Sequence, residues 1–291
     1  MSRAGIVLCG GRSSRMGRAK ARLPWFGQTM IEHVVTVLME AVDEVVVVTS
    51  ESLELPSVSS LGARLVTDRE PERGPLAGIR DGLLALESDA EFAFVTSTDA
   101  PFLTQAYVSA MLDRERACAP LSEGFVQVLS GVYSRGGGAV ADRLLGEGVG
   151  RPLRLLEALD YEQIEFSVDE RPVAWHGFNT AEAYLDSVRG IEPDAKAEIE
   201  FVWGEGARTE CPPREVPVGT LGEVLASCGD FSAWADEGLV PDSCRVEVGS
   251  GEILRQLSVP VGPRERVRVT DVPVEKLFDG VVDIRNGEVS N

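Results

Sequence analysis

Short apolar runs alternate with helical repeats along the first 190 residues of the chain. Ile6–Leu8 is rich in β-branched residues and too short for a helix, which predicts a buried parallel strand. Thr29 and Glu32 have the spacing of a capping box, and apolar residues follow at helical intervals. The same patterns predict strands at 45–49, 65–67, 92–96, 126–133 and 164–168, and helices from about 75, 104, 138, 152 and 180.

This alternation is typical of an α/β fold with a mostly parallel, doubly wound, Rossmann-like sheet covered by helices. In such sheets the ligand binds at the carboxyl ends of the strands. Four residues fall at predicted strand ends: Gly10, Thr49, Asp68 and Asp99. We therefore expect the site at that edge of the sheet.

The pattern changes after residue 190. A polar stretch, 190–196, separates the predicted first domain (1–190) from a second at 197–291. Strands are expected at 199–203, 214–218, 244–248 and 267–270, with one helix at 221–228. This order predicts a small α+β domain of the β-grasp type.

The composition of the chain excludes several classes of binding partner. Among 291 residues, 47 acidic and 28 basic side chains give a formal net charge of −19, which argues against binding to nucleic acid or an anionic membrane. No apolar run approaches the ~18 residues of a membrane helix, so we expect a soluble, cytoplasmic protein. The five cysteines are odd in number and form no CxxC, and His33 and His176 lie far apart, so no disulfide framework, zinc site or histidine metal site is expected.

The segment from Ala4 to Lys20 combines a strand, a glycine pair and concentrated positive charge. Gly10 and Gly11 let backbone N–H groups approach an anion, although the loop has neither GxGxxG nor P-loop spacing. Five cations follow within eleven positions: Arg12, Arg15, Arg18, Lys20 and Arg22. On an acidic chain this indicates a polyphosphate ligand, and Lys20 suits a single phosphate oxygen. The alternative is a solvated basic loop.

Two oxygen-bearing residues could hold a metal ion. Asp99 directly follows an apolar strand and could bind Mg²⁺ against nucleotide phosphates. The alternative for Asp99 is a cap for the helix expected from Thr104. Asn179 could add a neutral ligand, or it could instead cap the helix that follows it.

Taken together, these residues resemble the nucleotidyltransferases, and specifically the molybdenum cofactor guanylyltransferase (MobA-like) family. LCGGRSSRMGRAK, at residues 8–20, is similar to the signature LAGGxxxRMGxxK. The likeness continues, in the family's order and over about residues 1–190, through TDREPERGPLAGI, TSTDAPFL, QVLSGVY, RPLRLLE and FNTAEAY. Two positions depart from the family pattern: Thr49 stands where asparagine is common, and Ala19 where aspartate is frequent. The resemblance therefore does not decide whether the nucleotide base is guanine or cytosine.

The resemblance implies a set of site residues and an activity. The nucleotide would be held by Leu8, Cys9, Gly10, Gly11, Lys20, Thr49, Asp68 and Asp99. Lys20, assisted by Arg15, would neutralise charge on the α-phosphate, and Asp99 would carry Mg²⁺ with Asn179. The reaction implied is transfer of GMP from GTP to molybdenum-molybdopterin, with release of pyrophosphate. Positioning and charge neutralisation would supply the rate.

The tail has a shorter likeness. REVPVGTLGEVL, at residues 214–225, is similar to the entry into the helix of the MoaD/ThiS sulfur carriers. Those carriers end in Gly-Gly, whereas this chain ends in GEVSN, so a docking or regulatory module for molybdenum cofactor assembly proteins is expected rather than a working carrier. An unrelated small β domain is the alternative. For the whole chain, the alternatives are cytidylyl or uridylyl transfer to another phosphorylated acceptor, and a non-catalytic adaptor.

Overall fold

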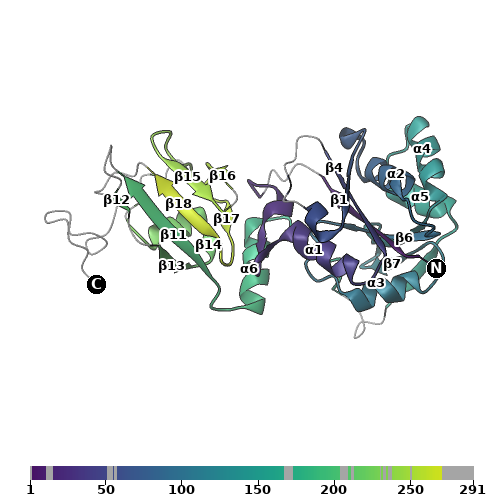
Figure 1. The fold of residues 1–291 in the computed structure, drawn as a ribbon, viewed down its shortest axis with the longest axis horizontal. Helices are drawn as coiled ribbons and strands as arrows, with labels where there is room; N and C mark the ends of the chain where they lie inside the picture. The colour runs from purple at the N-terminus through teal and green to yellow at the C-terminus, as the bar shows by residue number, and fades with distance from the viewer. Residues whose placement is uncertain are drawn as a thin grey trace. The chain divides into compact units, whose positions relative to one another are not determined.

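The computed structural model describes residues 2–10, 16–50, 55, 58–166, 173–203, 209–210, 213–229, 231, 234, 238–249 and 251–270. The chain divides into two compact units, which are described separately (Figure 1). The first unit comprises Met1–Arg12, Lys20–Arg22 and Gln28–Gly177, and the second comprises Ser13–Ala19, Leu23–Gly27 and Phe178–Asn291. The second unit therefore includes short segments that the sequence placed in a 1–190 domain.

The first unit is built on a mostly parallel sheet with the order β10-β7-β9-β6-β1-β4-β5, as predicted. The central strand β1 pairs in parallel with both β4 and β6, while β9 is antiparallel to its neighbours. The strands are β1 (Ala4–Cys9), β3 (Gln28–Thr29), β4 (Glu44–Thr49), β5 (Arg64–Thr67), β6 (Phe92–Ser97), β7 (Cys118–Ser122), β8 (Phe125–Val126), β9 (Ser130–Ser134) and β10 (Glu162–Glu165).

Helices cover both faces of this sheet (Figure 1). Successive residues of β1 point to opposite faces: Val7 packs in the core with α1 and α3, and Ile6 in the core with α2, α4 and α5. Burial on both faces explains why the strands are continuous apolar runs. The helices are α1 (Met30–Met39), α2 (Pro75–Ala85), α3 (Gln105–Leu112), α4 (Gly137–Gly146) and α5 (Pro152–Ala158), with 3₁₀ turns η1 (Lys20–Arg22), η2 (Val58–Leu61) and η3 (Pro71–Arg73).

Local sequence signals account for several boundaries. The predicted capping box is present, since the Thr29 side chain accepts from the Glu32 amide and the Glu32 carboxylate accepts from the Thr29 amide. The strand expected over 126–133 is divided into β8 and β9, because the chain turns between them with Gln127 N donating to Pro120 O at 2.8 Å. α3 begins after its N-cap Thr104, where a helix was expected, and ends at Leu112.

The C-terminal sheet (β11, β12, β13, β15, β16 and β18) belongs to the second unit, in which β14 and β17 form a separate two-stranded sheet. The order of the C-terminal sheet is β12-β11-β18-β15-β16, with β11 and β18 parallel and the other pairs antiparallel. α7 packs into its core through Leu221, Val224 and Leu225. This order, with a helix between the two hairpins, is that of a β-grasp. The unit contains β2 (Pro24–Trp25), α6 (Ala181–Ile191), β11 (Lys196–Trp203), β12 (Thr209–Glu210), β13 (Arg214–Pro217), β14 (Gly219–Thr220), α7 (Leu221–Ala226), β15 (Arg245–Val248), β16 (Glu252–Leu254), β17 (Pro260–Val261) and β18 (Arg266–Thr270).

Two further findings concern expected absences. Of the cysteines that the structure describes, Cys9, Cys118, Cys228 and Cys244 are buried and form no disulfide, and Cys211 lies outside the described residues. Within the described ranges, the helices are too short or too polar to cross a bilayer.

Candidate functional site

The backbone at the end of β1 opens to solvent. Leu8 and Cys9 are buried, whereas Gly10 is exposed, and a Cβ placed on Gly10 would meet no atom within 4 Å. This leaves room for a ligand to approach the main chain beside the sheet. Gly11 and Arg15, both predicted site residues, lie outside the described residues.

Cys9 and Thr49 lie opposite each other on β1 and β4. Burial raises the pKa of the Cys9 thiol to about 12, against a smaller lowering by its hydrogen bond with Thr49. Thr49 is itself buried, and its hydroxyl donates to the Ser50 carbonyl at 3.4 Å. The thiol therefore stays protonated at neutral pH and is no nucleophile. The nucleotide contact expected of Thr49 stays a prediction.

Lys20 and Asp99 come together although 79 residues separate them. Lys20 begins η1, and its Nζ lies 2.6 Å from Oδ2 of Asp99. The other carboxylate oxygen, Oδ1, accepts from Ser97 Oγ at 2.6 Å. The two charged side chains are 19% and 25% exposed, so a ligand can reach the pair. Thr104, rather than Asp99, caps α3, which removes the structural alternative for this aspartate.

Gly177 packs directly against Asp99. A Cβ on residue 177 would lie 2.2 Å from the Asp99 carbonyl oxygen and 3.2 Å from its Cγ, too close for any side chain. A glycine here is therefore required to let the chain pass behind the carboxylate. The spacing of the sequence contained no signal for this contact.

Asp68 begins the loop after β5. Its amide donates to Thr49 O at 2.8 Å, and its Oδ1 accepts from the Glu70 amide at 2.9 Å. Asp68 and Leu8 approach each other over Gly78, where a Cβ would lie 3.8 Å from Asp68 Oδ2 and 3.2 Å from Leu8 Cδ2. Burial raises the pKa of the Asp68 carboxyl; the Glu70 amide lowers it, while neighbouring carboxylates add to the rise. The predicted nucleoside residues Leu8 and Asp68 thus share one region.

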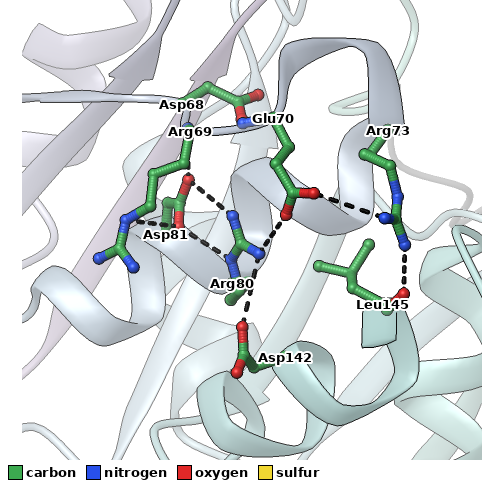
Figure 2. A network of polar contacts seen from close by, with 8 residues as sticks. All are labelled: Asp68, Arg69, Glu70, Arg73, Arg80, Asp81, Asp142 and Leu145. Carbon is green, nitrogen blue, oxygen red and sulfur yellow. Dashed lines mark hydrogen bonds and ion pairs between the residues drawn. The ribbon is translucent and has the colours of Figure 1, made fainter. Parts of the chain in front are cut away.

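A buried ion pair on α2 supports the loop that carries Asp68. Figure 2 shows the Arg80 guanidinium between Asp81, Glu70 and Asp142. Asp81 is fully buried and accepts from Arg80 Nε at 2.9 Å and from the Arg69 amide at 2.8 Å. Arg80 Nη1 donates to Glu70 Oε2 at 2.6 Å. Sequence reasoning missed this network, although adjacent charges within an apolar helix were a usable signal.

The remaining predicted residues have simpler surroundings. Asn179 is exposed in the second unit, and Thr180, not Asn179, caps α6, so the capping alternative is wrong and the metal role stays a prediction. His33 is half-buried on α1 with Nε2 2.9 Å from Pro101 O, as a packing residue would be. Across the described ranges, no three His, Cys, Asp or Glu side chains cluster as a metal-binding group.

Comparison with known proteins identifies the family of this chain. Residues 5–163 match the family model described as MobA-like NTP transferase domain, which is more than half of the chain. The chain belongs to that family. Leu8, Lys20, Asp68 and Asp99 all fall inside the matched range of this MobA-like chain, whereas Asn179 and the C-terminal sheet fall outside it.

Relatives and a solved structure agree with the family. The chain is 34% identical over 56% of its length to a probable molybdenum cofactor guanylyltransferase of Mycobacterium avium, of which 85% is covered. It is 29% identical over 65% of its length to a probable molybdenum cofactor guanylyltransferase of Bacillus mycoides, of which 96% is covered. Molybdopterin-guanine dinucleotide biosynthesis protein A from Archaeoglobus fulgidus shares the fold, with a TM-score of 0.51, 20% identity, and coverage of 62% of this chain and 93% of that one.

Proposed function

We propose that this MobA-like chain transfers GMP from GTP to molybdenum-molybdopterin and releases pyrophosphate. The observation that carries the proposal is the Lys20–Asp99 pair, 2.6 Å apart, in a family whose relatives are named molybdenum cofactor guanylyltransferase. A cation and a carboxylate side by side, both accessible, suit a site that must hold phosphate oxygens and a counter-ion at once.

Each residue has a task in that reaction. The main chain at Gly10 is open for the nucleoside end, and Asp68 lies close to Leu8 at the same end of the strands. Lys20 carries a compact charge that would neutralise the α-phosphate while pyrophosphate departs. Ser97 holds one oxygen of Asp99, which fixes the carboxylate without neutralising it. No covalent protein intermediate is needed, since positioning and charge neutralisation suffice.

The residues present fit a magnesium ion. Mg²⁺ is bound by one or two carboxylates together with substrate phosphates, and Asp99 offers an accessible carboxylate beside Lys20. Asp99 would hold the ion, with Asn179 as the second ligand proposed from sequence. When bound, Mg²⁺ neutralises developing charge on the phosphate oxygens. Omission of Mg²⁺ should therefore abolish turnover.

Substitution of Lys20 tests the catalytic role. We expect Lys20→Ala to lower kcat by roughly 10²–10³-fold, the usual loss when one charge-stabilising donor is removed. Lys196→Ala is the matched control, because Lys196 is exposed on the C-terminal sheet, where its Nζ lies 2.8 Å from Glu215 Oε2. Pyrophosphate release is the assay. Full activity in Lys20→Ala would reject the catalytic role of Lys20, and absence of pyrophosphate release by the wild type would support the non-catalytic adaptor instead.

Base preference is a separate question, because Thr49 replaces the residue usual in guanylyltransferases. The protein is incubated with molybdenum-molybdopterin, Mg²⁺ and each of GTP, CTP, UTP and ATP in turn. GTP consumption must dominate under this proposal. Equal or better use of CTP would reject guanylyl transfer and favour a cytidylyltransferase.

A further inference from the structure

Arg18, within the signature segment (residues 8–20), is buried in the second unit rather than exposed to a ligand. Its side chain is 1% exposed. Glu252 Oε2 accepts from Nε at 3.1 Å and from Nη2 at 2.8 Å. Glu265 accepts from Nη1 at 3.0 Å and lies 2.9 Å from Nη2, and Pro260 O accepts from Nη1 at 3.2 Å. The whole guanidinium edge is thus occupied by protein oxygens.

The two carboxylates come from separate parts of the C-terminal sheet. Glu252 begins β16, and Glu265 lies in the turn between β17 and β18. Glu265 is buried, and its Oε2 also accepts from the Gly262 amide at 3.0 Å, which closes that turn. The Arg18 site therefore exists only when the C-terminal sheet is folded.

Gly17 makes a second, independent contact with the same sheet. Its φ is +69°, and a Cβ on it would lie 2.6 Å from Val259 Cγ2 and 2.8 Å from Gln256 Oε1. The backbone of the signature segment therefore rests directly on residues 256–260. The left-handed conformation and the close approach both favour glycine.

These contacts change the interpretation of Arg18. Its position in the signature segment predicted a phosphate contact, but its donors are already committed to two carboxylates and a carbonyl. A buried arginine that donates to two glutamates and a carbonyl is an anchor, because moving it would leave buried donors and acceptors without their hydrogen-bond partners. The anchor lies two positions before Lys20 in the chain, so it restrains the backbone that leads to the proposed catalytic lysine.

We propose that Arg18 is a positioning residue, through which Glu252 and Glu265 set the conformation of residues 16–20 and so the affinity for nucleotide. The proposal rests on the proposed function only for the identity of the nucleotide. By linkage, bound nucleotide must also stabilise residues 252–265. The C-terminal sheet then contributes to nucleotide binding by the transferase.

The test uses the full chain and isosteric variants. Glu252→Gln and Glu265→Gln remove one charge each and keep the side-chain shape. Arg18→Lys keeps the positive charge but loses the planar guanidinium that can donate to both carboxylates. Glu215→Gln is the control, since Glu215 lies exposed on β13 of the same sheet. Calorimetry with GTP and Mg²⁺ gives the dissociation constant, and hydrogen–deuterium exchange gives the protection of residues 16–22 and 252–265.

We expect each anchor variant to raise the GTP dissociation constant by roughly five- to tenfold, the low end of known couplings between sites. Exchange at residues 16–22 should quicken in these variants and not in Glu215→Gln. GTP should slow exchange at residues 252–265 in the wild type and in Glu215→Gln, and less in the anchor variants. Folded variants with unchanged exchange at 16–22, or with wild-type or tighter GTP binding, would overturn the proposal. If the wild type binds no GTP, the proposed function fails, and exchange at 16–22 still decides the inference.

Discussion

The buried pair Arg80–Asp81 allows a quantitative prediction for Asp81→Asn. Asp81 is 0% exposed and accepts from Arg80 Nε, Arg80 Nη2 and the Arg69 amide at 2.9, 3.3 and 2.8 Å. Asparagine keeps the shape but removes the charge and turns an N–H group toward these donors. Breaking a buried pair costs about 3–5 kcal/mol. Because Glu70 still neutralises Arg80 at 2.6 Å, we expect the low end, about 3 kcal/mol.

Hydrogen exchange of α2 amides measures this loss in the first unit alone. About 3 kcal/mol corresponds to exchange roughly 100-fold faster for the slowest amides of Pro75–Ala85. Asp142→Asn is the control, because Asp142 lies 3.5 Å from the same Arg80 and is 64% exposed. Its cost should stay below about 0.5 kcal/mol. If Asp81→Asn exchanges no faster than this control, Asp81 does not compensate the buried guanidinium and the reasoning is refuted.

Two other predictions concern packing and acid stability. In urea titrations, Gly82→Ala should lower the free energy of unfolding by about 1–3 kcal/mol, because the new Cβ would lie 2.5 Å from Ile6 Cγ2. Gly190→Ala on α6 should raise it by about 0.5–1 kcal/mol, because a Cβ there meets nothing within 4 Å. Burial raises the pKa of the Glu44 carboxyl, but hydrogen bonds from the Ser88 side chain, from the Glu87 and Ser88 amides and from Arg64 outweigh it and lower that pKa from 4.5 to about 2. Glu44 therefore contributes stability above pH 4.5 that is lost as the pH falls to about 2, and Glu44→Gln should lower Tm at pH 6 but not at pH 2.

The sequence predicted those helices and strands whose formation depends on a local pattern of residues. The start of α1 follows from Thr29 and Glu32 alone, and the apolar runs β1 and β4 follow from burial on both sheet faces. β7 was missed because Pro120 interrupts it and its partners are distant in sequence: Cys118 pairs with Val132 on β9 and with Glu162 on β10. Pairings of that kind leave no periodicity to read.

The candidate site divides in the same way. Lys20 and Asp99 were each predictable from residue type and position beside an apolar strand, and the structure places them together. The role of Arg18 was not predictable, because its partners Glu252 and Glu265 lie 234 and 247 residues away in the sequence. A count of nearby charges cannot distinguish a cation that awaits an anion from one whose anions arrive with a later part of the chain.

The Arg18 anchor also bears on how fast a nucleotide can arrive. Among the cations of this segment that the structure describes, Lys20 is matched by Asp99 and Arg18 by two glutamates. The positive field expected from the bare sequence is thereby cancelled in part, on a chain whose formal net charge is −19. Electrostatic steering toward such a segment is weak. The association rate of a nucleoside triphosphate should therefore not fall as ionic strength rises, because salt also screens the repulsion by the acidic chain, and selectivity arises after encounter, when phosphate oxygens replace Asp99 at the lysine.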